Sequence, residues 1–267
     1  MRNSAALSIE LKRRFGDRLL WLDRIDPGAR TIRGRWYDAT KRTVDAALLL
    51  CASPIIAPVF FFCALLIKLD SPREPLFFAQ QRTGRHGHRF TMYKFRAMVS
   101  DAEDLKARML RLNERKWPDF RITHDPRVTR VGRLLRKTGL DELPQFLNVL
   151  RGDMSLVGPR PTSFLAGTYA MWQTERLEVP PGITGLWQIV GRDESEFDDR
   201  SRLDIAYIER RCLWLDIQIM VRTVVAAMSH LAPLSRARQS RFAAAIGYRI
   251  QGRAAACDAS AGTRGGP

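Results

Sequence analysis

An uncharged apolar run is the feature that most constrains the fold of this chain. The run occupies residues 46–67, which are 22 residues without a charged side chain. As a straight helix with a rise of ~1.5 Å per residue it would reach ~33 Å, against ~30 Å of hydrocarbon in a typical bilayer. Pro54 and Pro58 lie in its middle, where proline removes helical hydrogen bonds. The sequence therefore predicts a membrane helix that is broken at its centre.

Two topologies remain open for this segment from its own residues. Lysine and arginine flank the run on both sides, and cationic flanks favour the cytoplasmic face of a membrane. In lipid the carbonyls freed by the prolines need another donor, and we expect the Ser53 hydroxyl to bond back to Leu49. A re-entrant membrane helix over residues 44–69 that bends at Ser53–Pro54 and returns to the same face satisfies all of these features. A kinked helix that spans the bilayer is equally compatible with the segment alone, because proline is tolerated in spanning helices.

The basic charge of the chain is concentrated at its ends. Of 267 residues, 44 are Lys or Arg and 28 are Asp or Glu, which gives a net charge of +16. Residues 1–35 predict a basic, weakly structured arm with a short amphipathic helix around Leu7–Leu22, and residues 235–267 predict a basic, disordered tail. Such charge suits anionic lipid, phosphorylated substrates or nucleic acid. We expect no nucleic acid partner, because the excess lies in the arms and no recognised nucleic-acid motif is present.

Downstream of the apolar run, the pattern predicts an α+β fold that is mostly helical. Residues 76–98 are typical of a small β-hairpin, whereas residues 101–116, 202–211 and 213–228 predict helices. Residues 127–137 predict a basic amphipathic helix with its apolar side chains on one face. That pattern fits an interfacial helix on a membrane surface, and equally a helix that covers a soluble core.

Two adjacent carboxylates, Asp141 and Glu142, begin a predicted amphipathic helix that ends at Gly152. The structural interpretation is that Asp141 caps this helix and that both acids meet the positive end of its dipole. The functional interpretation is that a helix N-terminus favours phosphate, that one carboxylate acts as a nucleophile toward phosphorus, and that the other holds Mg²⁺.

A second candidate element, 158-GPRP-161, follows soon after that helix. Pro159 and Pro161 fix the backbone around Arg160, and a rigidly presented guanidinium suits bidentate phosphate binding. A solvated arginine in a stiff loop is the alternative. The Gly-rich stretch 180–197, which contains Arg192, lacks the GxxxxGK[ST] pattern and is therefore not a P-loop.

Taken together, four stretches resemble one family. They are YKFRAM, TRVGRLLRKTGLDELPQFLNVLRGDMSLVGPRP, PPGITGLWQIVGR and LDIAYIERRCLWLDIQIM, and in order and spacing they cover roughly residues 36–228. The chain resembles the bacterial sugar transferases, the monotopic phosphoglycosyl transferases. The resemblance implies a catalytic domain over residues 36–234. Longer members carry a large N-terminal region with several spanning helices, and we expect this chain to be the compact, catalytic-core form.

The resemblance also implies an activity and a set of site residues. Asp141 would attack the sugar-linked phosphate of a UDP-sugar and expel UMP, and polyprenyl (undecaprenyl) phosphate would then take the sugar-1-phosphate. Glu142 would hold Mg²⁺, while Arg160 with its two prolines, and Arg192, would contact phosphate or nucleotide. Ser53–Pro54 matches the family's break in its re-entrant helix, although the second proline, Pro58, departs from that pattern.

The same resemblance implies a location and leaves other questions open. It places the protein in the bacterial inner membrane, monotopic, in contact with membrane lipid and facing the cytoplasm. There it would initiate exopolysaccharide or other glycoconjugate assembly. It does not identify the sugar or the oligomeric state, nor a role for Asp204 and Asp216 in the matching motifs. A non-catalytic, membrane-tethered binding module is the alternative, against which the intact set of acids and arginines counts.

Overall fold

The computed structural model describes most of the chain, namely residues 4–19, 21–22, 25, 34–114, 120, 122–190 and 196–231. In these residues helices predominate, and the named strands form two two-stranded sheets. The predicted class, α+β and mostly helical, is therefore confirmed. The predicted tail over residues 235–267 lies outside the described residues.

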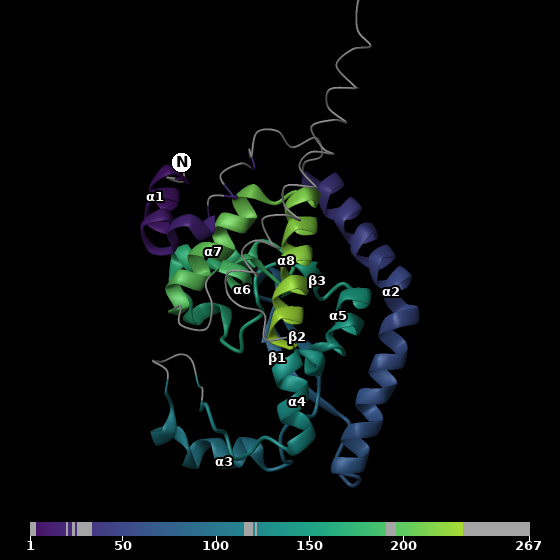
Figure 1. Cartoon of the computed structure of the whole chain (residues 1–267). Helices are drawn as coiled ribbons and strands as arrows, with labels where there is room; N and C mark the ends of the chain where they lie inside the picture. Colours follow the sequence, from purple (N-terminus) through teal and green to yellow (C-terminus); the bar gives the residue numbers. More distant parts are fainter. Residues whose placement is uncertain are drawn as a thin grey trace, which may run out of the picture.

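The apolar run belongs to one long helix, α2 (Gly34–Asp70). Figure 1 shows α2 along one side of the molecule, bent in its middle, and Pro54 and Pro58 lie inside the helix. The Ser53 hydroxyl donates to the Leu50 carbonyl at 2.7 Å. That carbonyl is the one that Pro54, lacking an N–H, leaves without its helical partner. The predicted acceptor, Leu49, is wrong by one residue.

The outer face of α2 is apolar and uncovered. The helix is long and apolar enough to cross a membrane, with a mean hydropathy of 2.4 in its most apolar 18-residue window, of which 11% is buried. Ile55 and Phe61 in its middle are 75% and 70% exposed. A core helix would bury such side chains, so their exposure over this length indicates that the protein associates with a membrane.

The inner face of α2 packs on the same domain along both halves of the helix. In the first half, Leu49 packs with Met92 and Val149. In the second half, Cys63 and Ile67 join a separate buried cluster that contains Phe95 and Leu135. The domain therefore holds α2 on both sides of its bend.

The predicted hairpin is confirmed. Strand β1 (Phe77–Thr83) pairs antiparallel with β2 (Arg89–Phe95). In the connecting turn, a 3₁₀ turn over Arg85–Gly87, His86 and Gly87 have φ angles of 55° and 80°. Helix α3 (Ala102–Arg108) and a 3₁₀ turn (Leu110–Leu112) follow, so the described helix is shorter than the one predicted over residues 101–116.

The basic amphipathic helix is α4 (Arg130–Thr138). It begins at the N-cap Thr129, whose hydroxyl accepts from the Gly132 N–H, and ends at Gly139 with a φ of 74°. Within α4, Leu135 lies on the buried face of the helix, whereas its neighbour Leu134 is 52% exposed. One side of α4 therefore covers the core formed by α2 and the hairpin, and the other side is free to meet a surface.

The segment after α4 departs from the prediction. A 3₁₀ turn, η5 (Leu140–Glu142), precedes α5 (Gln145–Arg151), and Pro144 occupies the N-cap position. The prediction that Asp141 caps this helix is therefore wrong, although Gly152 ends it as expected. Beyond α5, β3 (Ser155–Val157) pairs in parallel with β4 (Gly182–Thr184). This small sheet was not predicted.

Three further helices build the largest core. They are α6 (Leu186–Val190), α7 (Phe197–Arg210) and α8 (Leu213–Leu231), and the two predicted over residues 202–211 and 213–228 are confirmed. Two 3₁₀ segments, η6 (Ala166–Thr168) and η7 (Met171–Leu177), precede β4.

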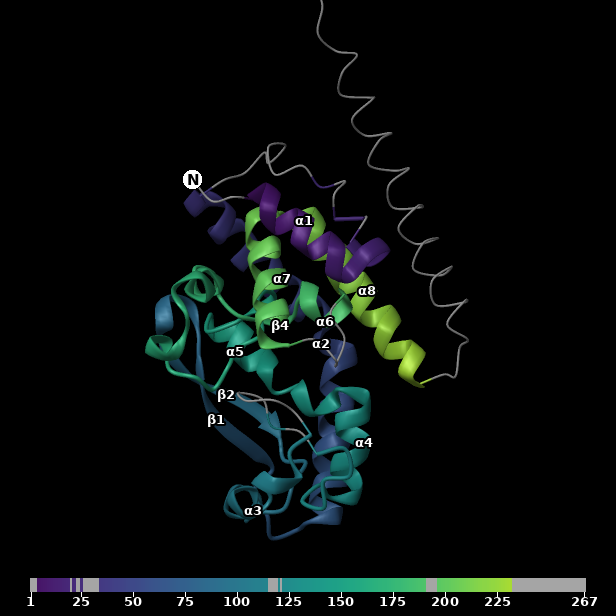
Figure 2. The same cartoon turned by 90° about the vertical axis from the view of Figure 1, so that its left-hand side faces the viewer.

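The N-terminal arm is folded onto this core. Helix α1 (Ser4–Phe15) and a 3₁₀ turn (Gly16–Leu19) lie across α7 and α8, as Figure 2 shows. Leu11, Leu19 and Leu22 are each 3% exposed and belong to the same buried cluster as residues of α7 and α8. The described residues thus contain the short helix expected around Leu7–Leu22. Three leucines make this part of the arm belong to the core, so it is not the weakly structured segment that the sequence predicted.

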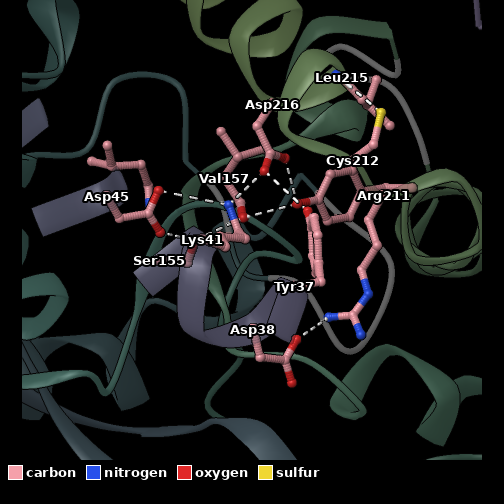
Figure 3. Close-up of polar contacts among 12 residues, drawn as sticks. Tyr37, Asp38, Lys41, Asp45, Ser155, Val157, Arg211, Cys212, Leu215 and Asp216 are labelled. Atoms are coloured by element: carbon pink, nitrogen blue, oxygen red, sulfur yellow. Dashed lines mark hydrogen bonds and ion pairs between the residues drawn. The ribbon is translucent and has the colours of Figure 1, made fainter. Parts of the chain in front are cut away.

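A buried polar cluster, which we call the anchor cluster, fastens the first half of α2 to β3, α7 and α8 (Figure 3). Lys41 lies between two carboxylates, 2.7 Å from Asp216 Oδ2 and 3.7 Å from Asp45 Oδ1. The Ser155 hydroxyl donates to Asp45 at 2.6 Å, and the Tyr207 hydroxyl donates to Asp216 at 2.7 Å. Asp216, which had no role from the sequence, is thus a structural residue.

Candidate active site

The two candidate carboxylates lie in the 3₁₀ turn η5, between α4 and α5. Glu142 is fixed there by two cations from separate elements. The Lys94 ammonium of β2 lies 3.0 Å from Glu142 Oε1, and Arg160 pairs with both carboxylate oxygens, with NH1 3.3 Å from Oε2. The fold therefore brings together Asp141, Glu142 and Arg160, and adds Lys94.

The pKa values of Asp141 and Glu142 are shifted in opposite directions by their surroundings. Burial opposes the ionisation of Glu142, but the charges of Arg160 and Lys94 outweigh it and hold the pKa of this carboxyl well below its usual range. Burial raises the pKa of Asp141, and Lys94 offsets only part of the effect. Among the described residues, no side chain donates a hydrogen bond to the Asp141 carboxylate. One acid is thus paired, and the other is left available for chemistry.

A cavity of about 540 Å³ opens beside Asp141, between the hairpin, α3, the turn after β3 and α7. Its lining includes nine basic side chains and three acidic ones. The basic residues are Arg82, Lys94, Arg96, Lys106, Arg127, Arg136, Arg160, Arg176 and Arg200. The volume is within the range of small-molecule sites, and the charge fits an anionic ligand.

The turn that carries Arg160 is held by close backbone contacts with strand β4. Gly158 N–H donates to the Thr184 carbonyl, and Gly182 N–H donates to the Pro159 carbonyl, both at 2.9 Å. A Cβ atom on Gly182 would lie 2.0 Å from the Gly158 nitrogen, so a side chain there would push β4 away from the turn. Pro159 and Pro161 are buried on either side of Arg160. This packing keeps the guanidinium directed at Glu142.

Other predicted site residues lie elsewhere. Arg192 lies outside the described residues. Ser53 and Pro54 belong to the bend of α2 and do not line the cavity. Conversely, sequence reasoning missed Arg82 of β1 and Lys94 of β2, which both line the cavity. The only signal for Lys94 was its place within YKFRAM.

The acids fit one kind of metal site. Within the described residues, no group of three or more His, Cys, Asp or Glu side chains could hold a metal ion. Mg²⁺ does not need such a group, because it binds one or two carboxylates and completes its shell with substrate phosphates and water. Asp141 and Glu142 supply that donor set, which differs from the clusters that Zn²⁺ requires.

A bent apolar helix packed on a domain that contains a cationic cavity with a free carboxylate, next to a paired one, defines a membrane-associated protein with a site for an anionic ligand. A family model described as "Bacterial sugar transferase" matches residues 36–230, which include every one of these features. The chain belongs to the bacterial sugar transferase family.

Individual relatives agree with this assignment. The chain is 44% identical over 186 residues to a galactosyl transferase, CpsE, of Streptococcus agalactiae serotype III, a match to 69% of this chain and 41% of that protein. It is 41% identical over 188 residues to the undecaprenyl-phosphate galactose phosphotransferase of Salmonella typhimurium, covering 68% and 39%. An exopolysaccharide production protein, ExoY, of Rhizobium meliloti is 36% identical over 191 residues, covering 70% and 84%. The chain thus spans about two fifths of the first two relatives and most of the third.

Proposed function

We propose that the protein transfers a sugar-1-phosphate from a UDP-sugar to polyprenyl phosphate and releases UMP. The observation that carries this proposal is the free Asp141 carboxylate beside the Glu142–Arg160 pair at a cationic cavity. Undecaprenyl phosphate as the acceptor is supported by the names of two relatives, a galactose phosphotransferase and an N-acetylgalactosamine phosphotransferase.

The reaction would proceed in two displacements at one phosphorus. A carboxylate oxygen of Asp141 attacks the sugar-linked phosphorus, and the bond to the bridging oxygen breaks, so that UMP leaves with the bonding electrons. A phosphate oxygen of polyprenyl phosphate then attacks the same phosphorus. The bond to Asp141 breaks, and its carboxylate is regenerated. Burial of Asp141 favours the first step, because a poorly hydrated carboxylate is a better nucleophile.

The remaining site residues offset charge where an anionic nucleophile must approach a diphosphate. Arg160 and Lys94, already placed against Glu142, stabilise the negative charge that develops on the phosphoryl oxygens. Glu142, with Asp141 beside it, would hold Mg²⁺. When bound, Mg²⁺ would neutralise diphosphate charge and make UMP a better leaving group.

The packing of α2 supports a re-entrant topology. Lys41 and Leu49 in its first half, and Cys63 and Ile67 in its second half, contact the domain that carries the site. A helix that crossed the bilayer would place one of these ends on the opposite side from that domain. We therefore propose that both ends of α2 face the cytoplasm, where UDP-sugars are found, at the inner membrane.

The activity is tested with purified protein in detergent, Mg²⁺, polyprenyl phosphate and a panel of UDP-sugars that includes UDP-galactose and UDP-N-acetylgalactosamine. We expect UMP release with at least one sugar, and a loss of about a thousandfold or more in Asp141→Asn, which keeps the shape but removes the nucleophile. The matched control is Asp101→Asn, which changes an exposed aspartate at the start of α3. No UMP from any sugar, or full activity in Asp141→Asn, would indicate a binding module instead.

The topology is tested by labelling single cysteines near residues 38 and 72 in membrane vesicles with an impermeant reagent. Both positions should react from the cytoplasmic side only. Reaction from opposite sides would establish a spanning helix.

A further inference from the structure

Two arginines, Arg82 and Arg176, hold the turn that carries Arg160, and we call them the flanking arginines. Arg176 of η7 donates from NH2 to the Arg160 carbonyl at 2.9 Å. Arg82 of β1 makes a longer contact from NH1 to the Pro161 carbonyl, at 3.5 Å. Both side chains line the same cavity as Asp141. The flanking arginines therefore contact both the rigid turn and the space where a ligand would lie.

Each flanking arginine keeps a buried donor that no described residue satisfies. Arg176 is 4% exposed, yet its NH1 has no hydrogen-bond partner, and Arg82 Nε is also buried without one. Trp187 lines the same cavity, and its indole N–H is also buried without a hydrogen-bond partner. Buried donors are normally paired, because an unpaired one loses its bonds to water without replacement. These donors are therefore arranged for acceptors that a ligand would bring.

Asp204 fixes the orientation of Arg176. This carboxylate of α7, 1% exposed, accepts from the same NH2 at 2.6 Å, so that both NH2 hydrogens are used and NH1 is left for the cavity. The ring of Phe197 lies over the guanidinium, 5.4 Å from its Cζ. Burial raises the pKa of Asp204 to about 6, although Arg176 opposes the rise. The structure thus holds this arginine in place, whereas a solvated one would be free to move.

We propose that the flanking arginines bind the diphosphate of the nucleotide donor together with Arg160, and that Asp204 is a positioning residue for Arg176. The inference rests on the proposed function for the identity of the donor. Electrostatics support it, because burial and the nearby charge of Arg160 lower the pKa of Arg82 to about 10. A diphosphate would relieve the crowding of these cations, and the planar fork of arginine matches its oxygens.

The test is equilibrium binding of three compounds, UDP, inorganic pyrophosphate and uridine, to the full-length protein in detergent with Mg²⁺. In Arg176→Lys, which keeps the charge but loses the fork, we expect UDP and pyrophosphate to bind about tenfold more weakly, with uridine unchanged. Arg82→Lys should show the same selectivity. The matched control is Arg108→Lys on the exposed face of α3, which should leave all three affinities unchanged.

A second variant guards against loss of the fold, since removing Arg176 alone leaves a buried carboxylate unpaired. Arg176→Met combined with Asp204→Leu removes both charges and should keep the melting temperature while weakening UDP binding by about tenfold or more, again without affecting uridine. Equal weakening of UDP and uridine, no weakening at all, or a wild-type protein that binds neither UDP nor pyrophosphate would overturn the proposal. If the wild-type protein binds UDP through these arginines but releases no UMP, the proposed function is contradicted and this inference stands.

Discussion

At the scale of single residues, the main feature of the site is that the adjacent carboxylates of Asp141 and Glu142 have different partners. Glu142 pairs with Lys94 and Arg160, while Asp141 meets no donor from the described residues. The 3₁₀ turn η5 produces this difference, because it directs one carboxylate to the cations and leaves the other at the cavity. If α5 had begun at Asp141, the carboxylate would have bonded to backbone amides at the start of the helix and would not be free at the cavity.

The raised pKa of Asp141 predicts a specific pH dependence. In the proposed reaction a protonated Asp141 cannot attack, so kcat/KM should fall as pH falls, with a midpoint above 3.8, the value of an ordinary aspartate. Lys94→Met removes a charge that lowers the pKa of both Asp141 and Glu142. The acid limb should therefore move to higher pH in this variant. The measurement is UMP release as a function of pH, and an unmoved or lowered limb would contradict the assignment.

The sequence could supply Asp141, Glu142 and Arg160 because they are near one another along the chain and in informative contexts. It could not supply Lys94, Arg82 or Arg176. These arginines and this lysine come from β1, β2 and η7, and only tertiary packing brings them to one cavity. The sequence around Lys94, Arg82 and Arg176 does not distinguish these residues from the other lysines and arginines, of which the chain has 44 in total.

At the scale of elements, the long apolar helix α2 is fastened to the domain by a buried polar cluster in its first half and by apolar packing in its second half. In the anchor cluster, Lys41 is the cation shared by Asp45 and Asp216, and all three residues are 9% exposed or less. Burial raises the pKa of Asp216, and Lys41 opposes that rise. Such a cluster fixes one geometry, because a shifted helix would leave buried charges unpaired.

The anchor cluster predicts a large effect of one substitution. Lys41→Met keeps the bulk of the side chain but leaves two buried carboxylates without their cation, and should destabilise the protein by about 3–5 kcal/mol. Thermal unfolding in detergent measures the effect. Adding Asp216→Leu should recover part of the loss, and Lys137→Met, on the exposed side of α4, should change stability little. A neutral Lys41→Met would show that the cluster does not fasten α2.

At the scale of the whole molecule, the folded unit is larger than the part that matches the family. Residues 36–230 match, yet α1 lies outside this range and buries leucines in the core of α7 and α8. Ion pairs add to the contact, between Arg14 and Asp199 and between Glu10 and Arg202. Since α7 also lines the cavity through Phe197 and Arg200, α1 supports the wall of the site from behind.

This packing predicts that the N-terminal segment contributes to stability. Leu11→Ala removes a side chain that is 3% exposed and should destabilise the protein by about 2–5 kcal/mol. The control is Leu165→Ala, since Leu165 is 61% exposed and should lose little. The melting temperatures of both variants are compared with that of the wild type. If the two variants match, α1 does not form part of the folded core.

The sequence by itself determined the features that depend on near neighbours. The apolar run with its prolines, the hairpin and the helices α4, α7 and α8 all follow from periodicity and from glycine and proline chemistry, which act within a few residues. Only the tertiary structure decided what depends on distant residues. Asp141, expected to cap a helix, lies in a 3₁₀ turn with a free carboxylate. Basic side chains from separate elements line the cavity beside it, and α1 is part of the core although the sequence predicted a weakly structured arm. Packing energy comes from contacts between segments far apart in the chain, and no local pattern records which segments will meet.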